Sequence, residues 1–133
     1  TITLSSSDIA DNALSISNTS TLYTAGTDTG ITETSGLARK KTNSGSNTVL
    51  IDSDAGIGVD ITADKSAKVY IKNVNDRGDG TKYVSILLTT VEIGRLYGGD
   101  WMFIPWSGRS GKDIEFTASD TTETTLEYVV FYE

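Results

Sequence analysis

The stretch Asp113-Ile114-Glu115-Phe116-Thr117-Ala118 alternates strictly between polar and apolar side chains. A two-residue period of this kind is typical of a β-strand that buries one face and exposes the other. The same period occurs in Lys68-Val69-Tyr70-Ile71-Lys72, where Val69 and Ile71 are predicted to point inward, and again around 48–52 and 59–63. The sequence therefore predicts a succession of half-buried strands.

Further strands are predicted at 83–89, 101–106 and 124–133, and polar, glycine-rich turns recur about every ten residues. Roughly eight short strands with such spacing are typical of a β-sandwich or a jelly roll. No segment has the clustered helix formers that would favour a helix. With 133 residues, the chain has the size of one domain, so we expect a single all-β domain.

The first part of the chain differs from the rest. Residues 1–47 are rich in Ser, Thr, Gly, Asn and Asp, with widely spaced apolar residues, whereas residues 48–133 carry the regular strands. Leu14 and Ile16, each flanked by serine, are compatible with a short strand. Residues 1–47 are predicted to form either an extended arm or edge strands of the 48–133 sandwich body.

Composition limits the chemistry. The chain has no Cys and no His, so it cannot form a thiolate nucleophile, a Cys/His zinc site or a Ser-His-Asp triad. The carboxylates Asp113, Glu115 and Glu127 are scattered, and no pair suggests a glycosidase. We expect no enzyme activity and no cofactor.

The net charge of the chain limits its partners. The formal value of −7 argues against nucleic acid or an anionic membrane as partner. The start of the chain resembles no signal peptide, so we expect a soluble protein.

Two predicted strands are apolar on both faces: Trp101-Met102-Phe103-Ile104-Pro105-Trp106 and the segment 126–132. Such a strand is either covered on both sides or has one face against another molecule. The aromatic block is either a core corner or a binding surface, and we expect one tryptophan to be buried and the other to lie at an interface. The aromatic candidates for partner binding are Tyr97, Trp101, Phe103, Trp106, Tyr128 and Tyr132.

Two polar segments are further candidates. Arg39-Lys40-Lys41 is the basic cluster of an acidic chain, and it is either a solvated face or a docking site for an acidic patch. The segment 73–80 contains Arg77-Gly78-Asp79, a tripeptide found in adhesion motifs but also ordinary turn chemistry. Asp76 and Asp79 in this segment are candidate calcium ligands, although it lacks the ligand spacing of an EF-hand, so we expect no metal.

The second half of the chain resembles a known group of proteins. The segments Val69-Tyr70-Ile71-Lys72-Asn73, Gly99-Asp100-Trp101 running to Pro105-Trp106, and Leu126-Glu127-Tyr128 are similar to motifs of small virion structural proteins of tailed bacteriophages. The similarity covers about residues 67–133. Proteins of this kind are similar to capsid decoration, or cement, proteins, which lie on the outside of the shell and brace neighbouring capsomers.

This resemblance implies a virion protein, assembled in the host cytoplasm, that binds the outer surface of the major capsid protein and stabilises the head. It also implies other virion proteins as partners, or copies of the chain in an oligomer or symmetric array. Two alternatives remain open: a receptor- or carbohydrate-binding module of a tail fibre or adhesin, and a structural component of the tail or neck.

Overall fold

The computed structural model describes residues 2–6, 14–19, 21–31, 33–42, 45–54, 67–78, 82–119 and 123–133. These residues contain strands and turns but no helix, and none of their segments is a helix long and apolar enough to cross a membrane. The strands are β1 (Ile2–Ser6), β2 (Leu14–Asn18), β3 (Glu33–Thr34), β4 (Ala38–Thr42), β5 (Thr48–Ile51), β6 (Ala67–Asn73), β7 (Tyr83–Leu88), β8 (Val91–Tyr97), β9 (Trp101–Trp106), β10 (Ile114–Ala118) and β11 (Thr124–Tyr132).

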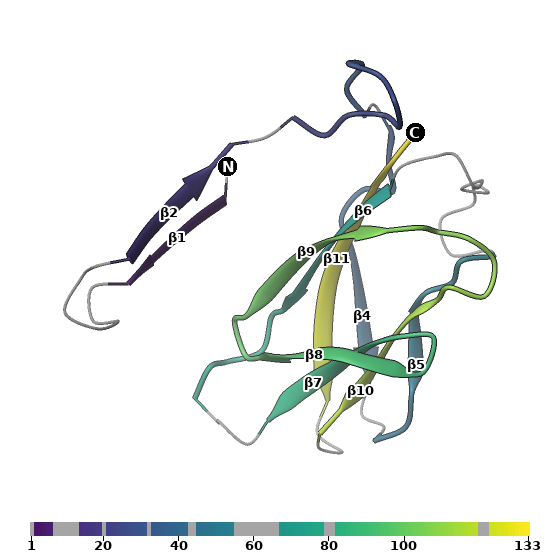
Figure 1. The fold of residues 1–133 in the computed structure, drawn as a ribbon. Coiled ribbons are helices and arrows are strands. Elements are labelled where there is room, and N and C mark those ends of the chain that lie inside the picture. Colours follow the sequence, from purple (N-terminus) through teal and green to yellow (C-terminus); the bar gives the residue numbers. More distant parts are fainter. Residues whose placement is uncertain are drawn as a thin grey trace.

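The body is a β-sandwich of two antiparallel sheets, which confirms the predicted fold class (Figure 1). Sheet I has the strand order β5-β10-β7-β8, and sheet II has the order β3-β11-β6-β9, with β4 also paired to β11. β8 and β9 follow one another in the chain but belong to different sheets. The turn between them, 98–100, therefore closes one side of the sandwich.

The core lies between the sheets and follows the predicted alternation. In β6, Val69 and Ile71 are fully buried, and in β10, Ile114 and Phe116 are fully buried, while their neighbours are partly exposed. Sixteen hydrophobic residues of the described part are buried, which is a sizeable core for a chain of this length. Two-residue periodicity thus located the buried face of these strands correctly.

The segment 33–42 forms edge strands rather than an arm. β4 pairs with the first half of β11 and β3 with its end, so the two short strands share one side of β11. At the bend between them, Ser35 donates its backbone N–H to the Val130 carbonyl, and its hydroxyl accepts the Val130 N–H. Of the two predicted alternatives for residues 1–47, edge strands therefore apply to 33–42.

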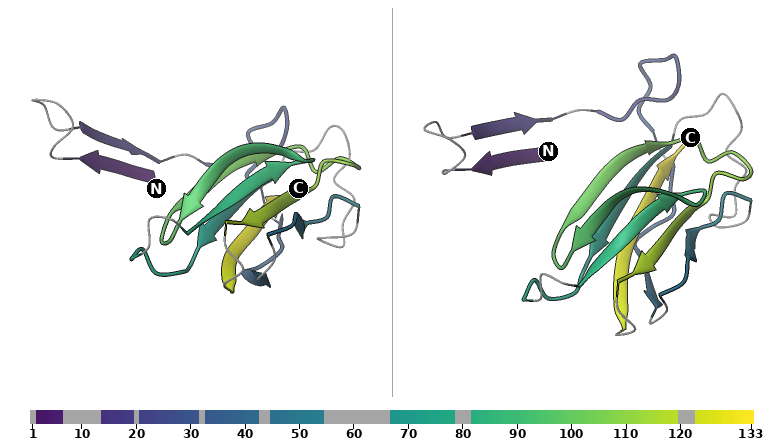
Figure 2. Two further views of the ribbon diagram at one scale, coloured as in Figure 1. Left: turned by 90° about the horizontal axis from the view of Figure 1, so that it is seen from below. Right: turned by 60° about the horizontal axis from the view of Figure 1, so that its bottom comes forward.

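The start of the chain forms a separate hairpin. β1 pairs with β2 over Ile2–Ser6 and Leu14–Asn18, so the strand predicted around Leu14 and Ile16 is present. In Figures 1 and 2 this hairpin, drawn in purple, lies beside the sandwich rather than within either sheet. The strand predicted at 59–63 lies outside the described residues.

Candidate partner-binding surface

The outer face of sheet II carries a continuous group of apolar side chains. Tyr70 of β6 lies opposite Phe103 of β9 and opposite Val129 of β11. Directly opposed residues of antiparallel strands share a face, and the core is on the other side, because Val69 and Ile71 point into it. The same strand pairings place Trp101, Pro105 and Phe131 on the outer face as well. We call this group the aromatic face; its members are Tyr70, Trp101, Phe103, Pro105, Val129 and Phe131.

The rings of the aromatic face are in contact with one another and accessible from outside. The ring centroids of Tyr70 and Trp101 are 6.2 Å apart, as are those of Phe103 and Phe131. Both distances lie within the range of favourable aromatic pairs. Trp101 is 46% exposed, Pro105 is exposed, and the other members are half-buried. Apolar groups gathered in this way on one sheet face are typical of a docking surface.

Charged side chains surround the aromatic face. Lys68 and Lys72 of β6 share its side of the sheet, and β4 adds Arg39, opposite Glu127, and Lys41, opposite Thr125. Arg39 donates from Nε and Nη2 to the same oxygen of Glu127, at 2.9 and 2.8 Å. Lys41 forms an ion pair of 2.8 Å with Glu123, just before β11 begins. Arg39 and Lys41 of the basic cluster thus lie on an edge strand of the sheet and are engaged in ion pairs.

Glu127 also affects a ring of the aromatic face. Partial burial, with a smaller contribution from the nearby Glu127 carboxylate, raises the pKa of the Tyr70 hydroxyl above its ordinary value. Tyr70 therefore stays a neutral hydrogen-bond donor throughout the physiological pH range. The face combines apolar rings with hydroxyl, guanidinium, ammonium and carboxylate groups at its border.

The two tryptophans have different environments, as the sequence predicted. Trp101 is on the aromatic face, whereas Trp106 is 5% exposed and belongs to the core. Trp106 ends β9 opposite Ala67, whose small side chain leaves room for the indole, and its Nε1–H donates to the Lys112 carbonyl at 2.7 Å. Trp106 was predicted as a partner-binding residue, and this is corrected here: it is a core residue that presents almost no surface.

The remaining predicted site residues are distributed over several surfaces. Phe103 belongs to the aromatic face. Tyr132, 8% exposed, is in the core, so its predicted role in binding is also corrected. Tyr128 is partly buried on the side of sheet II that faces the core, so it lies apart from the aromatic face. Lys40 lies opposite Leu126, on the side of the sheet that faces the core. Sequence reasoning missed Tyr70, because only strand pairing brings β6 between β9 and β11. It named the apolar segments that contain Pro105, Val129 and Phe131 but did not single these residues out as members of one surface.

Tyr97 lies on sheet I, apart from the aromatic face. It is 39% exposed and packs against Tyr83, with ring centroids 5.6 Å apart, while the Arg95 guanidinium lies 4.5 Å from the centre of the Tyr83 ring. Arg95 donates to Glu92, and hydrogen bonds from Ser85 and Arg95 lower the pKa of the Glu92 carboxyl. This group is a second exposed surface, in which Arg95 and Glu92 form an ion pair.

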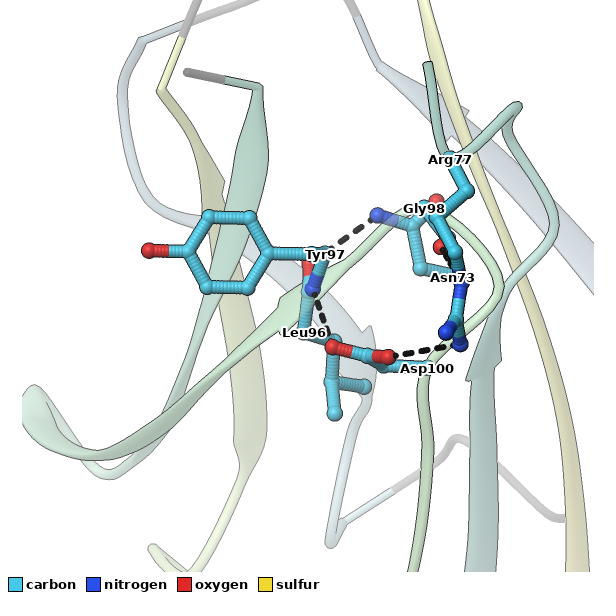
Figure 3. Close-up of polar contacts among 6 residues, drawn as sticks. All are labelled: Asn73, Arg77, Leu96, Tyr97, Gly98 and Asp100. Atoms are coloured by element: carbon cyan, nitrogen blue, oxygen red, sulfur yellow. Dashed lines mark hydrogen bonds and ion pairs between the residues drawn. The ribbon is translucent and has the colours of Figure 1, made fainter. Parts of the chain in front are cut away.

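The Arg77-Gly78-Asp79 tripeptide has a structural partner. Figure 3 shows Arg77 reaching across to the β8–β9 turn, where Nε donates to the Gly98 carbonyl at 3.2 Å and Nη2 pairs with Asp100 at 3.1 Å. Asp100 also accepts a hydrogen bond from the Tyr97 backbone N–H. The arginine therefore fastens one loop to another. Asp79 lies outside the described residues.

The metal prediction concerns the same loop. Asp76 is exposed, and the described residues contain no group of three Asp, Glu, His or Cys side chains placed to hold a metal ion. A pocket of about 240 Å³ opens next to Asp76; Asn75, Tyr83, Ser119, Glu123 and Thr124 are also among its described walls. Glu123 in its wall is paired with Lys41, so the pocket is a small recess of mixed polar and apolar lining.

No protein-family model matches the sequence, and a search of curated proteins finds no similar protein. The aromatic face is therefore the feature from which a function is proposed.

Proposed function

We propose that the protein is a capsid decoration protein of a tailed bacteriophage, which binds the outer surface of the major capsid protein and stabilises the head. The observation that carries the proposal is the aromatic face, with Trp101 46% exposed on a rigid sheet. The resemblance of residues 67–133 to small virion structural proteins supplies the class of partner. The aromatic face supplies a means of binding it.

The energetics favour binding through this face. Removing the exposed half of Trp101 from water contributes about 2–3 kcal/mol, and burying the other rings adds to it. Aromatic side chains in the centre of an interface commonly supply most of its binding free energy. Because these rings stand on paired strands, they lose little conformational freedom on docking.

The proposal assigns no catalysis to the chain. It has neither Cys nor His, and four of the described carboxylates, Glu127, Glu123, Asp100 and Glu92, are paired with an arginine or a lysine. A carboxylate that serves as general acid needs burial that raises its pKa, and the Glu92 pKa is instead lowered.

The proposal is tested on purified virions of the phage that carries the gene. Quantitative mass spectrometry should find the protein in a fixed ratio to the major capsid protein, and antibody labelling should place it on the head. Shells stripped of the protein should then rebind the wild-type chain but not a Trp101→Ala variant. Tyr97→Ala, which changes an exposed aromatic residue on the other sheet, is the matched control and should rebind normally. Absence from virions, or labelling of the tail, would contradict the proposal.

A second candidate is a carbohydrate-binding module of a tail fibre or adhesin. It is favoured by the neighbouring Tyr70 and Trp101 rings, which resemble a stacking platform for a sugar, with Arg39, Lys72 and Glu127 close by as hydrogen-bonding groups. Glycan-array binding that Trp101→Ala abolishes, without loss of the fold, would favour this candidate. A third alternative, a role as a structural component of the tail or neck, differs from the first proposal only in where the protein lies on the virion. Antibody labelling of virions distinguishes these two roles.

A further inference from the structure

We infer that the surface which docks on the aromatic face is an acidic protein surface, with carboxylates placed around an apolar recess. This inference rests on the proposed function, because it specifies the partner of the same face. It follows from the distribution of charge over the molecule, which is uneven.

The aromatic face is basic on an acidic protein. On the outer side of sheet II, the strands carry four cations, Arg39, Lys41, Lys68 and Lys72, against one carboxylate, Glu127. Glu123 just before β11 and Glu133 just after it add two further carboxylates, so the face carries about +1. The described residues together carry −2, so those outside the face carry about −3. A partner with negative charge is therefore attracted to this face and repelled by the others.

Lys72 is the cation best placed to meet such a partner. It lies between Trp101 of β9 and Glu127 of β11 in the strand register. Glu127 already accepts two N–H groups of Arg39, and among the described ion pairs Lys72 takes part in none. An ammonium group next to an exposed indole can bind a carboxylate at the edge of the buried aromatic contact. Such a charge orients the partner and accelerates its association.

The same charges argue against other occupants. Two copies of this chain stacked face to face would bring two basic surfaces together. A nucleic acid would meet three carboxylates on the face itself, and its long phosphate backbone would extend beyond the small basic area onto described residues of net negative charge. A protein surface of limited size and opposite charge fits without these penalties.

The test measures binding of the full chain to stripped shells over a range of salt concentrations. We expect Lys72→Glu to weaken binding at least about tenfold at low salt, and wild-type affinity to fall severalfold between about 50 and 500 mM NaCl. Lys112→Glu makes the same change of net charge at an exposed residue outside sheet II and should have a much smaller effect. The charge-conserving Lys72→Arg should bind like the wild type.

The outcomes separate this inference from the proposed function. If Trp101→Ala abolishes shell binding but Lys72→Glu and salt leave it unchanged, the acidic partner is overturned and the docking face stands. If the wild-type chain does not bind shells at all, the proposed function fails. Wild-type retention on immobilised DNA that Lys72→Glu abolishes, or self-association that Trp101→Ala abolishes, would likewise overturn the choice of an acidic protein partner.

Discussion

Asn73 donates its side-chain N–H to the backbone carbonyl of Leu96, 3.0 Å away, and so joins sheet II to sheet I through a hydrogen bond in the interior (Figure 3). Asn73 is only 2% exposed. Its side-chain oxygen accepts hydrogen bonds from the backbone and the side chain of Asn75, and its backbone groups bond to Gly99 and Asp100. One buried amide therefore ties Asn75, just after β6, to the β8–β9 turn.

Replacing this amide should strongly destabilise the fold. Asn73→Ala removes the bond to Leu96 and leaves buried polar groups without a partner, so we expect the free energy of unfolding to fall by about 3 kcal/mol. Chemical denaturation followed by circular dichroism measures this change. Asn47→Ala, at an exposed asparagine, is the control and should cost less than about 1 kcal/mol. Equal losses in the two variants would contradict the role assigned to Asn73.

The β8–β9 turn should not tolerate a side chain at Gly98. A Cβ added there would lie 2.1 Å from the Asp76 carbonyl oxygen and 2.8 Å from that of Asn75, so two backbone segments would have to separate. We expect Gly98→Ala to destabilise the protein by roughly 3 kcal/mol or more. In Gly94→Ala the new Cβ would meet nothing within 4 Å, so that variant should be neutral or slightly stabilising in thermal unfolding. A stable Gly98→Ala protein would show that the loop and the turn are not in contact.

Asp113 should make stability depend on acid pH. The hydroxyl and the backbone N–H of Ser53 both donate to its carboxylate, at 2.6 and 2.8 Å, and these bonds lower the pKa of Asp113. Because the pKa is lower in the folded state, this stabilisation is present at neutral pH and is lost as the pH falls below about 4. Asp113→Asn should therefore be less stable than the wild type by about 1–2 kcal/mol at neutral pH. The difference should shrink in denaturation curves recorded toward about pH 2.5, and a constant difference would contradict this explanation.

Substitution of Trp106 should mainly lower the stability of the fold, whereas substitution of Trp101 should mainly weaken binding. Trp106→Ala empties part of the core and removes the bond to Lys112, so we expect a loss of about 3–5 kcal/mol. Trp101→Ala removes a ring that is 46% exposed and loses the packing of its covered half on Tyr70, so it should cost about 1–2 kcal/mol, clearly less than Trp106→Ala. Urea denaturation measures both values. If Trp101→Ala unfolds as readily as Trp106→Ala, its loss of binding would have to be ascribed to misfolding.

The sequence predicted buried faces well where strands alternate regularly. β6 and β10 were predicted with the correct inward residues, because period-two alternation depends directly on the geometry of a strand. By contrast, β8 (Val91–Tyr97) was not predicted as a separate strand. The turn before it consists of Thr89 and Thr90, with φ of 46° and 69°, a conformation for which Gly, Asn or Asp is the usual signal. A hairpin without its usual turn residues is hard to recognise from sequence.

The candidate surface could be predicted only in part. Trp101 and Phe103 stood out because they are neighbours in an aromatic block, whereas Tyr70 and Phe131 are far away in the chain and meet them through strand pairing alone. Trp106 and Tyr132 were assigned to the same surface because both faces of their strands are apolar. Which face is buried depends on the position of the opposite sheet, and local composition does not contain that information.

Hydroxyl-radical footprinting of the protein, free and bound to shells, tests the central claim most directly. If the aromatic face is the docking surface, oxidation of Trp101, Phe103 and Phe131 should drop sharply on binding, while Tyr97 and Ile93 on sheet I should react as in the free protein. Unchanged oxidation of Trp101 in the bound protein, or protection centred on Tyr97, would contradict the account.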